Sequence, residues 1–151
     1  MPETHHPPDP EIRALAARLV GTSHGALATS LDGAPLVTRV GCLWLAGEGM
    51  GLLVSDLSDH ARALSQDPKA AILLGEPDEK GDPLTHPRLT VRGTVDARDK
   101  AAWRETWLAA RPKARLYYDF TDFRLMVLEP SDALLNGGFG RASRLAPSDL
   151  P

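Results

Sequence analysis

A strand that passes almost directly into a helix, within residues 50–64, constrains the fold of this chain more than any other feature. The strand is indicated by Leu52-Leu53-Val54, an apolar run typical of a largely buried, pleated surface. The helix is indicated by a capping side chain, either Ser58 or Asp59, followed by apolar residues on one face. These apolar residues are Leu57, Ala61 and Leu64. Asp67-Pro68 ends the helix, because proline cannot continue its hydrogen bonding.

The start of this helix carries side chains that suit an anion. Ser55 ends the strand, Ser58 opens the helix, and Arg62 lies on the same side of the helix as Ser58. His60 and the unpaired N–H groups of a helix N-terminus add to this arrangement, and a phosphate group is the natural ligand. The alternative is a capped surface helix with an exposed arginine, because caps of this type are common.

The composition is that of a soluble globular domain. The 151 residues are enough for one domain with its own core. The net charge of −3 argues against a nucleic-acid partner and against an anionic membrane. Cys42 is the only cysteine, which excludes an internal disulfide and a thiolate metal cluster. No signal peptide or membrane-spanning run is visible, so we expect a cytoplasmic protein.

Hairpin-linked strands dominate the first half of the chain. Asp32-Gly33 is a turn signal between two of them, and residues 88–96 alternate cleanly between apolar and polar side chains. The predicted strands are residues 25–30, 36–45, 52–54, 70–74, 88–96 and 120–129, and the predicted helices are residues 10–20, 58–66 and 97–110. This order predicts an α+β, mainly β, fold: a small barrel of about six mostly antiparallel strands with flanking helices. We expect residues 1–9 to form a flexible arm, residues 10–145 a single domain, and residues 146–151 a C-terminal tail.

Arg39 is a lone cation in the middle of an otherwise apolar strand. One face of that strand carries Leu36, Thr38, Val40, Cys42 and Trp44, and the other carries Val37, Arg39, Gly41, Leu43 and Leu45. Burial of an unpaired charge is costly, so Arg39 must meet solvent, a carboxylate or a bound anion. An outward-facing arginine in water is the simplest of these alternatives.

Most catalytic motifs are absent from the sequence. There is no G-x-x-x-x-G-K-[ST] loop, no H-E-x-x-H cluster and no G-x-S-x-G elbow. Gly137-Gly-Phe-Gly140 lies too close to the C-terminus to open a dinucleotide-binding unit. Trp103 and Trp107, four residues apart, indicate core or interface packing. One anion site and little other chemistry favour a protein whose reactivity comes from a cofactor.

An ordered set of short segments resembles the pyridoxamine 5′-phosphate oxidase-related, FMN-binding split-barrel family, and within it the N-terminal domain of the HugZ-type haem-utilisation proteins. These segments are Gly25-Ala-Leu-Ala-Thr29, Leu36-Val-Thr-Arg-Val40, Leu53-Val-Ser-Asp-Leu-Ser-Asp-His-Ala-Arg-Ala-Leu64, Asp67-Pro68, Pro87-Arg-Leu-Thr-Val-Arg-Gly93, Asp119-Phe120 and Gly137-Gly-Phe-Gly-Arg-Ala142. They extend over nearly the whole chain after Asp9, and the set is more specific than any single piece.

The resemblance implies an FMN-binding split barrel and a set of cofactor-binding residues. Arg39 matches the arginine that holds the FMN phosphate, and the backbone next to it faces the flavin ring. Ser55 matches a hydroxyl position, His60 lies near a lysine position, and Arg88 matches a flavin-contacting glutamine. The complete implied set is Thr38, Arg39, Val40, Gly41, Val54, Ser55, Ser58, His60, Arg62 and Arg88. The resemblance also implies a homodimer with flavin sites at its interface, near which Trp103, Trp107 and Phe139 are candidate apolar contacts.

Two departures from the family limit the expected activity. The oxidases' C-terminal substrate motif, a tryptophan with paired arginines, has no equivalent here, so we do not expect oxidation of pyridoxamine 5′-phosphate. The HugZ-type proteins carry a second domain that this sequence does not contain, so we do not expect haem degradation. Three hypotheses follow: an FMN-dependent oxidoreductase of a small molecule, a non-catalytic flavin or haem carrier or sensor, and an interaction module without a cofactor.

Overall fold

The computed structural model describes residues 5–138 and 140–151. Residues 1–4 of the predicted arm, and Phe139, lie outside the described residues. The elements are α1 Pro10–Val20, β1 His24–Leu31, β2 Ala34–Leu45, β3 Gly49–Ser55, α2 Asp59–Gln66, β4 Lys69–Leu74, η1 Pro83–Thr85, β5 Arg88–Arg98, α3 Arg104–Ala110, η2 Pro112–Leu116, β6 Phe123–Asn136, β7 Ala142–Leu145 and η3 Pro147–Asp149.

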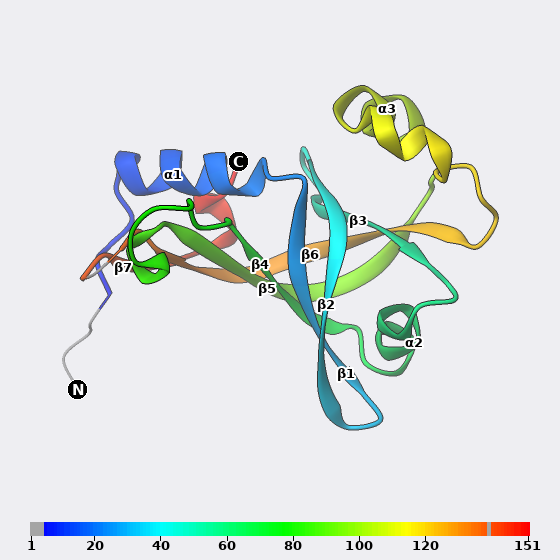
Figure 1. The fold of residues 1–151 in the computed structure, drawn as a ribbon, viewed down its shortest axis with the longest axis horizontal. Coiled ribbons are helices and arrows are strands. Elements are labelled where there is room, and N and C mark those ends of the chain that lie inside the picture. Colours follow the sequence, from blue (N-terminus) through cyan, green and yellow to red (C-terminus); the bar gives the residue numbers. More distant parts are fainter. Residues whose placement is uncertain (1–4, 139) are drawn as a thin grey trace.

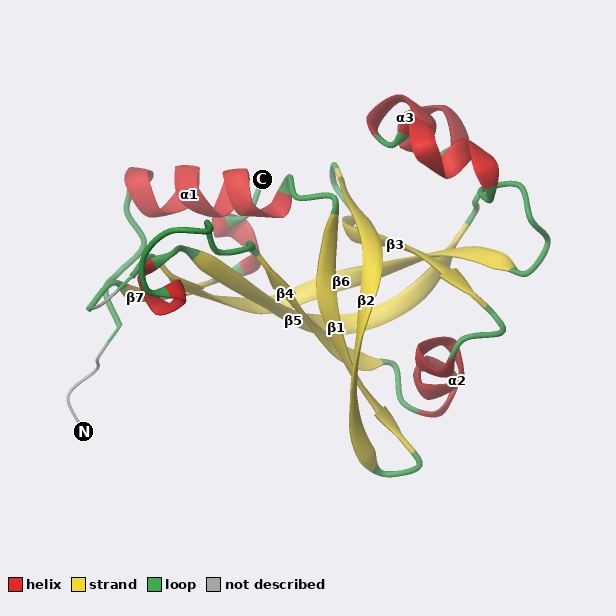
Figure 2. Cartoon of the chain, viewed as in Figure 1, coloured by secondary structure: helices red, strands yellow, loops and turns green. Residues whose placement is uncertain are grey.

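The strands form an antiparallel sheet that closes on itself (Figure 1). Their order is β3-β2-β1-β4-β5-β6-β7, and an additional pairing between β3 and β6 closes β1 to β6 into a barrel. The β7 strand extends the sheet beyond β6. Figure 2 shows the strands crossing at the centre of the molecule, with the helices on the outside. The predicted class, a mainly β barrel of antiparallel strands with flanking helices, is therefore confirmed.

Local sequence signals set the ends of the first two helices. The Asp9 side chain accepts a hydrogen bond from the Ile12 amide, and Pro10 stands at the first helical position of α1. Ser58 caps α2 by accepting a hydrogen bond from the Ala61 amide, which decides between the two predicted caps. Asp67 is the C-cap of α2, as the following proline predicts.

Two separate groups of buried side chains hold the fold together. The first fills the barrel and includes Leu27, Leu52, Ile72 and Val91, none of which is exposed to solvent. The second lies outside the barrel, where α3 and η2 pack on β3 and β6. Trp107, only 2% exposed, is a core residue of this second group, and Trp103 packs against it. Of the two predicted alternatives, core packing is therefore confirmed for Trp107, because α3 buries it within the chain.

The barrel is split between β2 and β3. Residues 34–41 of β2 pair with β1, and only from Cys42 to Leu45 does β2 pair with β3. In the same way, residues 53–55 of β3 pair with β6 but not with β2. Within the described residues, each of these two stretches therefore has a partner strand on one side only. Helix α2 lies in the angle between the β1–β2 hairpin and the end of β3 (Figure 1).

Two predicted boundaries are wrong. The helix predicted over residues 97–110 begins only at Arg104, because β5 continues to Arg98, where Ala97 and Arg98 pair with β6. The last predicted strand, residues 120–129, instead runs from Phe123 to Asn136. Pro130 does not end it: Pro130 lies opposite Gly93, and the next residue, Ser131, is the extra residue of a bulge in β6, of the kind at which sheets accommodate proline. No helix among the described residues is long and apolar enough to cross a membrane.

Candidate functional site

The predicted residues of β2 lie on opposite faces of the strand. Val40 faces the barrel core and is 4% exposed, whereas Arg39 and Gly41 are exposed on the outer face. The Arg39 side chain forms no hydrogen bond or ion pair within the described part of the chain. A Cβ atom placed on Gly41 would meet no other atom within 4 Å, so the outer side of this backbone is open. This stretch therefore offers an uncommitted guanidinium beside accessible backbone.

His60 connects β2 with α2. Its Nδ1 atom lies 3.1 Å from the Thr38 Oγ1 atom, on the inner side of β2. Burial lowers the pKa of His60 from its ordinary value, because removal from water disfavours the charged ring, while the neighbouring Asp59 carboxylate acts in the opposite direction. The contact places His60 beside the part of β2 that lacks a second partner strand, on the face of the strand opposite to Arg39. A mainly neutral imidazole at this part of β2 can form a hydrogen bond to a ligand through its second nitrogen.

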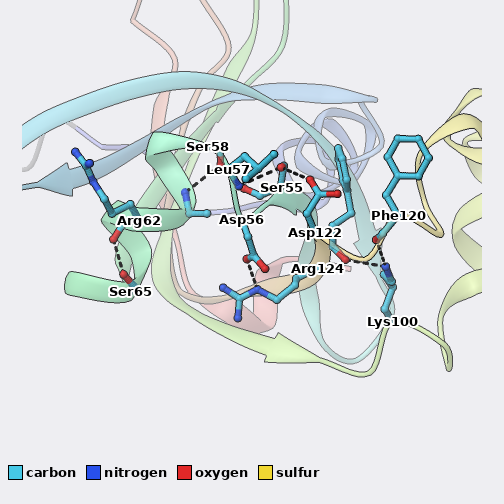
Figure 3. A network of polar contacts seen from close by, with 12 residues as sticks. Ser55, Asp56, Leu57, Ser58, Arg62, Ser65, Lys100, Phe120, Asp122 and Arg124 are labelled. Carbon is cyan, nitrogen blue, oxygen red and sulfur yellow. Dashed lines mark hydrogen bonds and ion pairs between the residues drawn. The ribbon is translucent and has the colours of Figure 1, made fainter.

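Ser55 is engaged in a hydrogen-bond network at the end of β3 (Figure 3). Its hydroxyl donates to the Asp122 Oδ2 atom at 2.6 Å and accepts from the Leu57 amide at 3.2 Å. The Ser58 hydroxyl donates to the Ser55 carbonyl oxygen at 2.6 Å, which fixes the cap of α2 to the end of β3. The structure thus brings Ser55 and Ser58 together, as predicted, but through their contacts with each other and with Asp122.

Arg62 points to a different part of the molecule. Its guanidinium lies 3.7 Å from the Asp32 carboxylate and 4.0 Å from that of Asp59. Gln66 strengthens the same connection, because its side-chain amide both donates to Asp32 Oδ1 and accepts from the Asp32 amide. In Figure 3 the Arg62 guanidinium is directed away from Ser55. Arg62 therefore fastens α2 to the β1–β2 turn, and the structure does not gather it with Ser55.

Arg88 lies at the beginning of β5, separated from β2 in the sheet by β1 and β4. Its guanidinium donates to the carbonyl oxygens of Leu84 and His86 in the preceding loop. The chain alone therefore does not bring Arg88 next to Arg39.

Val54 is 1% exposed and belongs to the barrel core, so it supports the site from below the surface.

Asp122 is the residue of this region that sequence reasoning missed. It is separated from Ser55 by 67 positions and precedes β6, so no local spacing connects the two residues. Only the pairing of Ser55 with Phe123 across β3 and β6 places them together.

Cys42, by contrast, offers no chemistry here: burial raises the pKa of its thiol to about 11, despite the nearby Arg111 guanidinium.

A cavity of about 440 Å³ lies elsewhere, between residues 6–9, α1 and the strands β6 and β7. Its walls include Ile12, Leu15 and Leu135, and none of the predicted cofactor-binding residues lines it. Ser143 also lines the cavity, and its hydroxyl is buried with no hydrogen-bond partner in the described residues. This cavity is therefore separate from the predicted site.

Comparison with known proteins identifies relatives among solved structures. One solved chain is 39% identical, with a TM-score of 0.88, over 95% of this chain and 97% of its own length. The heme binding protein from Mycobacterium smegmatis is 32% identical with a TM-score of 0.81, over 94% of this chain and 60% of that protein. A protein from Clostridium acetobutylicum, related to general stress protein 26 and described as of the pyridoxinephosphate oxidase family, shares the fold at 14% identity. Its TM-score is 0.71, over 92% of this chain and 96% of the other.

The closed antiparallel barrel with a split between β2 and β3 thus defines the class of the protein. The chain has the split-barrel fold of the pyridoxamine 5′-phosphate oxidase-related proteins, and the resemblance found in its sequence is confirmed at the level of this fold. It spans about 60% of the length of the mycobacterial heme binding protein. No family model and no curated protein matches the sequence.

Proposed function

We propose that this chain binds FMN on the open side of β2 and serves as a flavin-dependent oxidoreductase of a small molecule. The observation that supports the proposal best is the state of Arg39. It is exposed, it has no carboxylate partner within the described residues, and it stands where the barrel is split. An exposed guanidinium without a partner is a suitable donor for a phosphate group, which it can contact through two parallel hydrogen bonds.

The neighbouring residues fit a flat ring as well as a phosphate. Gly41 leaves the backbone open to close approach, and residues 38–41 lack a second partner strand whose atoms would compete for their backbone groups. His60 contacts Thr38 on the inner face of the same stretch of β2. When bound, FMN would supply the redox chemistry, and the chain would bind and orient it. We further propose a cytoplasmic homodimer with the flavin sites at its interface.

A titration with FMN tests the proposal directly. Arg39→Gln should weaken binding by about 1.5–3 kcal/mol, the range for hydrogen bonds to charged groups. Arg18→Gln is the matched control, because Arg18 is an exposed arginine in α1 and its replacement changes the net charge equally. Quenching of flavin fluorescence measures both affinities. Equal affinities of the two variants would contradict the assignment of Arg39 to the phosphate.

Haem is the second candidate ligand, because the mycobacterial relative with 32% identity is described as a heme binding protein. A haem propionate is also an anion that Arg39 could hold. Titration with haemin, followed by the Soret band, and competition between haemin and FMN distinguish the two ligands.

Reduction of the bound flavin by NAD(P)H then separates an oxidoreductase from a carrier. Sedimentation at micromolar concentration tests the dimer, since a monomer that retains FMN would exclude a site built at an interface.

A further inference from the structure

The cavity between residues 6–9, α1, β6 and β7 is lined by one buried hydroxyl group that lacks a partner. Ser143 is 1% exposed, and its Oγ atom has no hydrogen-bond partner within the described residues. A hydroxyl that has lost its contacts with water and has gained none with the protein is costly. The cavity volume of about 440 Å³ lies in the range of pockets that hold small molecules, about 300–1,000 Å³. The cavity therefore has room for a molecule that satisfies this hydroxyl.

Apolar side chains from the core form two walls of the cavity. Leu135 of β6 is 2% exposed and belongs to the barrel core. Ile12 and Leu15 of α1 line the cavity and pack against the same core. These walls offer contacts to an apolar molecule and no hydrogen bonds.

The chain before α1 forms another wall, and β7 holds it in place. The His6 amide donates to the Ala142 carbonyl oxygen at 2.8 Å, and the His6 Nε2 atom lies 2.9 Å from the Gly140 carbonyl oxygen. Pro7 and Pro8 continue this wall and have no backbone N–H group to donate. The wall is thus fixed by hydrogen bonds, and its own polar groups are engaged in them.

The charged residues that line the cavity have partners of their own. The Asp9 side chain accepts the Ile12 amide hydrogen at the start of α1. The Arg141 guanidinium lies 3.9 Å from the Glu11 carboxylate, and both side chains are exposed, so opposite charges compensate each other at the solvent side. Neither sign of charge prevails. The hydrogen-bonding side chain that remains for a ligand is the neutral hydroxyl of Ser143.

We propose that this cavity binds a neutral, mainly apolar molecule that carries one hydroxyl or carbonyl group. That group pairs with Ser143, and the apolar part lies against α1 and Leu135. A charged group beside Ser143 would leave water for apolar walls, which favours a neutral ligand. The proposal does not depend on flavin binding, because none of the predicted cofactor-binding residues lines the cavity. Figure 1 shows α1 and β7 at one end of the molecule and α2 at the other.

The experiment uses 2-naphthol and naphthalene, two probes with the same two-ring apolar body, of which only the first carries a hydroxyl. Equilibrium dialysis against the full chain should show saturable binding of both. Ser143→Ala should weaken the binding of 2-naphthol about threefold to tenfold, the effect of one hydrogen bond, and leave that of naphthalene unchanged. Ser65→Ala, at an exposed serine of α2, is the matched control and should change neither affinity.

A second variant tests whether the probes occupy this cavity. Ile12→Trp fills the cavity from α1 and should abolish the binding of both probes, whereas Leu116→Trp, at an 80% exposed residue, should not. An excess of FMN should not displace 2-naphthol, and displacement would show that the cavity is part of the flavin site. The inference is also overturned if neither probe binds the wild type, or if Ser143→Ala affects both probes equally or neither of them. The Ser143→Ala comparison decides alone if Ile12→Trp fails to fold.

Discussion

The two sides of the split differ in how much of their polar chemistry is already used. On the β2 side, Arg39 and Gly41 face outward without partners in the described residues. On the β3 side, Ser55 and Ser58 each both donate and accept hydrogen bonds. Both stretches belong to the segments that carry the family resemblance. Sequence similarity alone assigns both stretches to the cofactor site. In the structure, the β2 side presents side chains that are available for a ligand, whereas the polar groups of the β3 side bind one another and fix the start of α2.

The difference has a topological cause. At the level of Ser55, strand β3 is paired with the start of β6, and the turn that precedes β6 supplies Asp122. At the level of Arg39, strand β2 is paired only with β1, whose opposite residue is Ala26. The methyl side chain of Ala26 offers no polar atom, so the Arg39 side chain remains without a partner within the described residues. We therefore expect affinity to depend mainly on β2, and the geometry of α2 to depend on β3.

The largest effect should come from the place where the two sides join. Leu52 is fully buried and pairs with both Cys42 of β2 and Met126 of β6. Leu52→Ala should lower the free energy of unfolding by about 2–5 kcal/mol, because it leaves a cavity in the barrel core. Leu57→Ala, at an 87% exposed residue near the end of the same strand, should change it by less than about 0.5 kcal/mol. Urea denaturation measures both changes. Equal losses of unfolding free energy would show that the position of Leu52, where β3 pairs with both β2 and β6, is not essential to the core.

The next effect concerns the β3 side of the split, where Ser58 caps α2. Ser58→Ala removes the cap of α2 and its hydrogen bond to the Ser55 carbonyl oxygen. Loss of such a cap costs about 1 kcal/mol of stability. Ser65→Ala is the matched control in the same helix, because the Ser65 hydroxyl donates only to the Arg62 carbonyl and is exposed. If both substitutions destabilise equally in a thermal melt, the network at the end of β3 does not fix α2.

Sequence patterns predicted most of this fold, because strands, caps and turns are local. Asp9, Ser58 and Pro68 set helix ends through neighbours a few positions away, and Asp32 and Gly33 adopt the left-handed backbone that a tight hairpin turn requires. The boundary at residues 97–103 failed because tertiary contacts outweigh helix propensity there. Arg98 donates to Glu48 and Glu129, and this pairing keeps the end of β5 in the sheet.

The site was less predictable for a similar reason. Position in a motif indicated Arg39, His60 and Ser55, but not what each side chain contacts. The partners Asp122 and Asp32 come from turns far away in the sequence, and they decide that Ser55 and Arg62 are engaged while Arg39 is not. The strand burial pattern could place Arg39 outside the barrel, since its neighbours Thr38 and Val40 face inward.

Arg62 provides a sharper comparison of the two cationic residues. Motif position alone predicts that Arg39→Ala and Arg62→Ala weaken FMN binding equally. Because Arg62 is paired with Asp32 and Asp59 on the surface, we expect its removal to cost about 0.5 kcal/mol or less, in the range of exposed ion pairs. Parallel titrations of the two variants check this. A loss for Arg62→Ala as large as that for Arg39→Ala would mean that Arg62 leaves Asp32 when the ligand binds.

The smallest effect is the pH dependence that His60 introduces where the two sides meet α2. Burial lowers the pKa of His60 in the folded protein, so between its folded value and about 6.5 the unfolded chain binds more protons than the folded one. Stability from this residue is therefore complete above about pH 6.5 and is lost as the pH falls through the folded pKa. His60→Gln should flatten the decline of the unfolding free energy between neutral and mildly acidic pH, because glutamine does not titrate. Because the two proteins differ only at residue 60, the difference between the two profiles isolates His60. Identical slopes would mean that the ring beside Thr38 is as well hydrated as in the unfolded chain, and that α2 does not close over the inner side of β2.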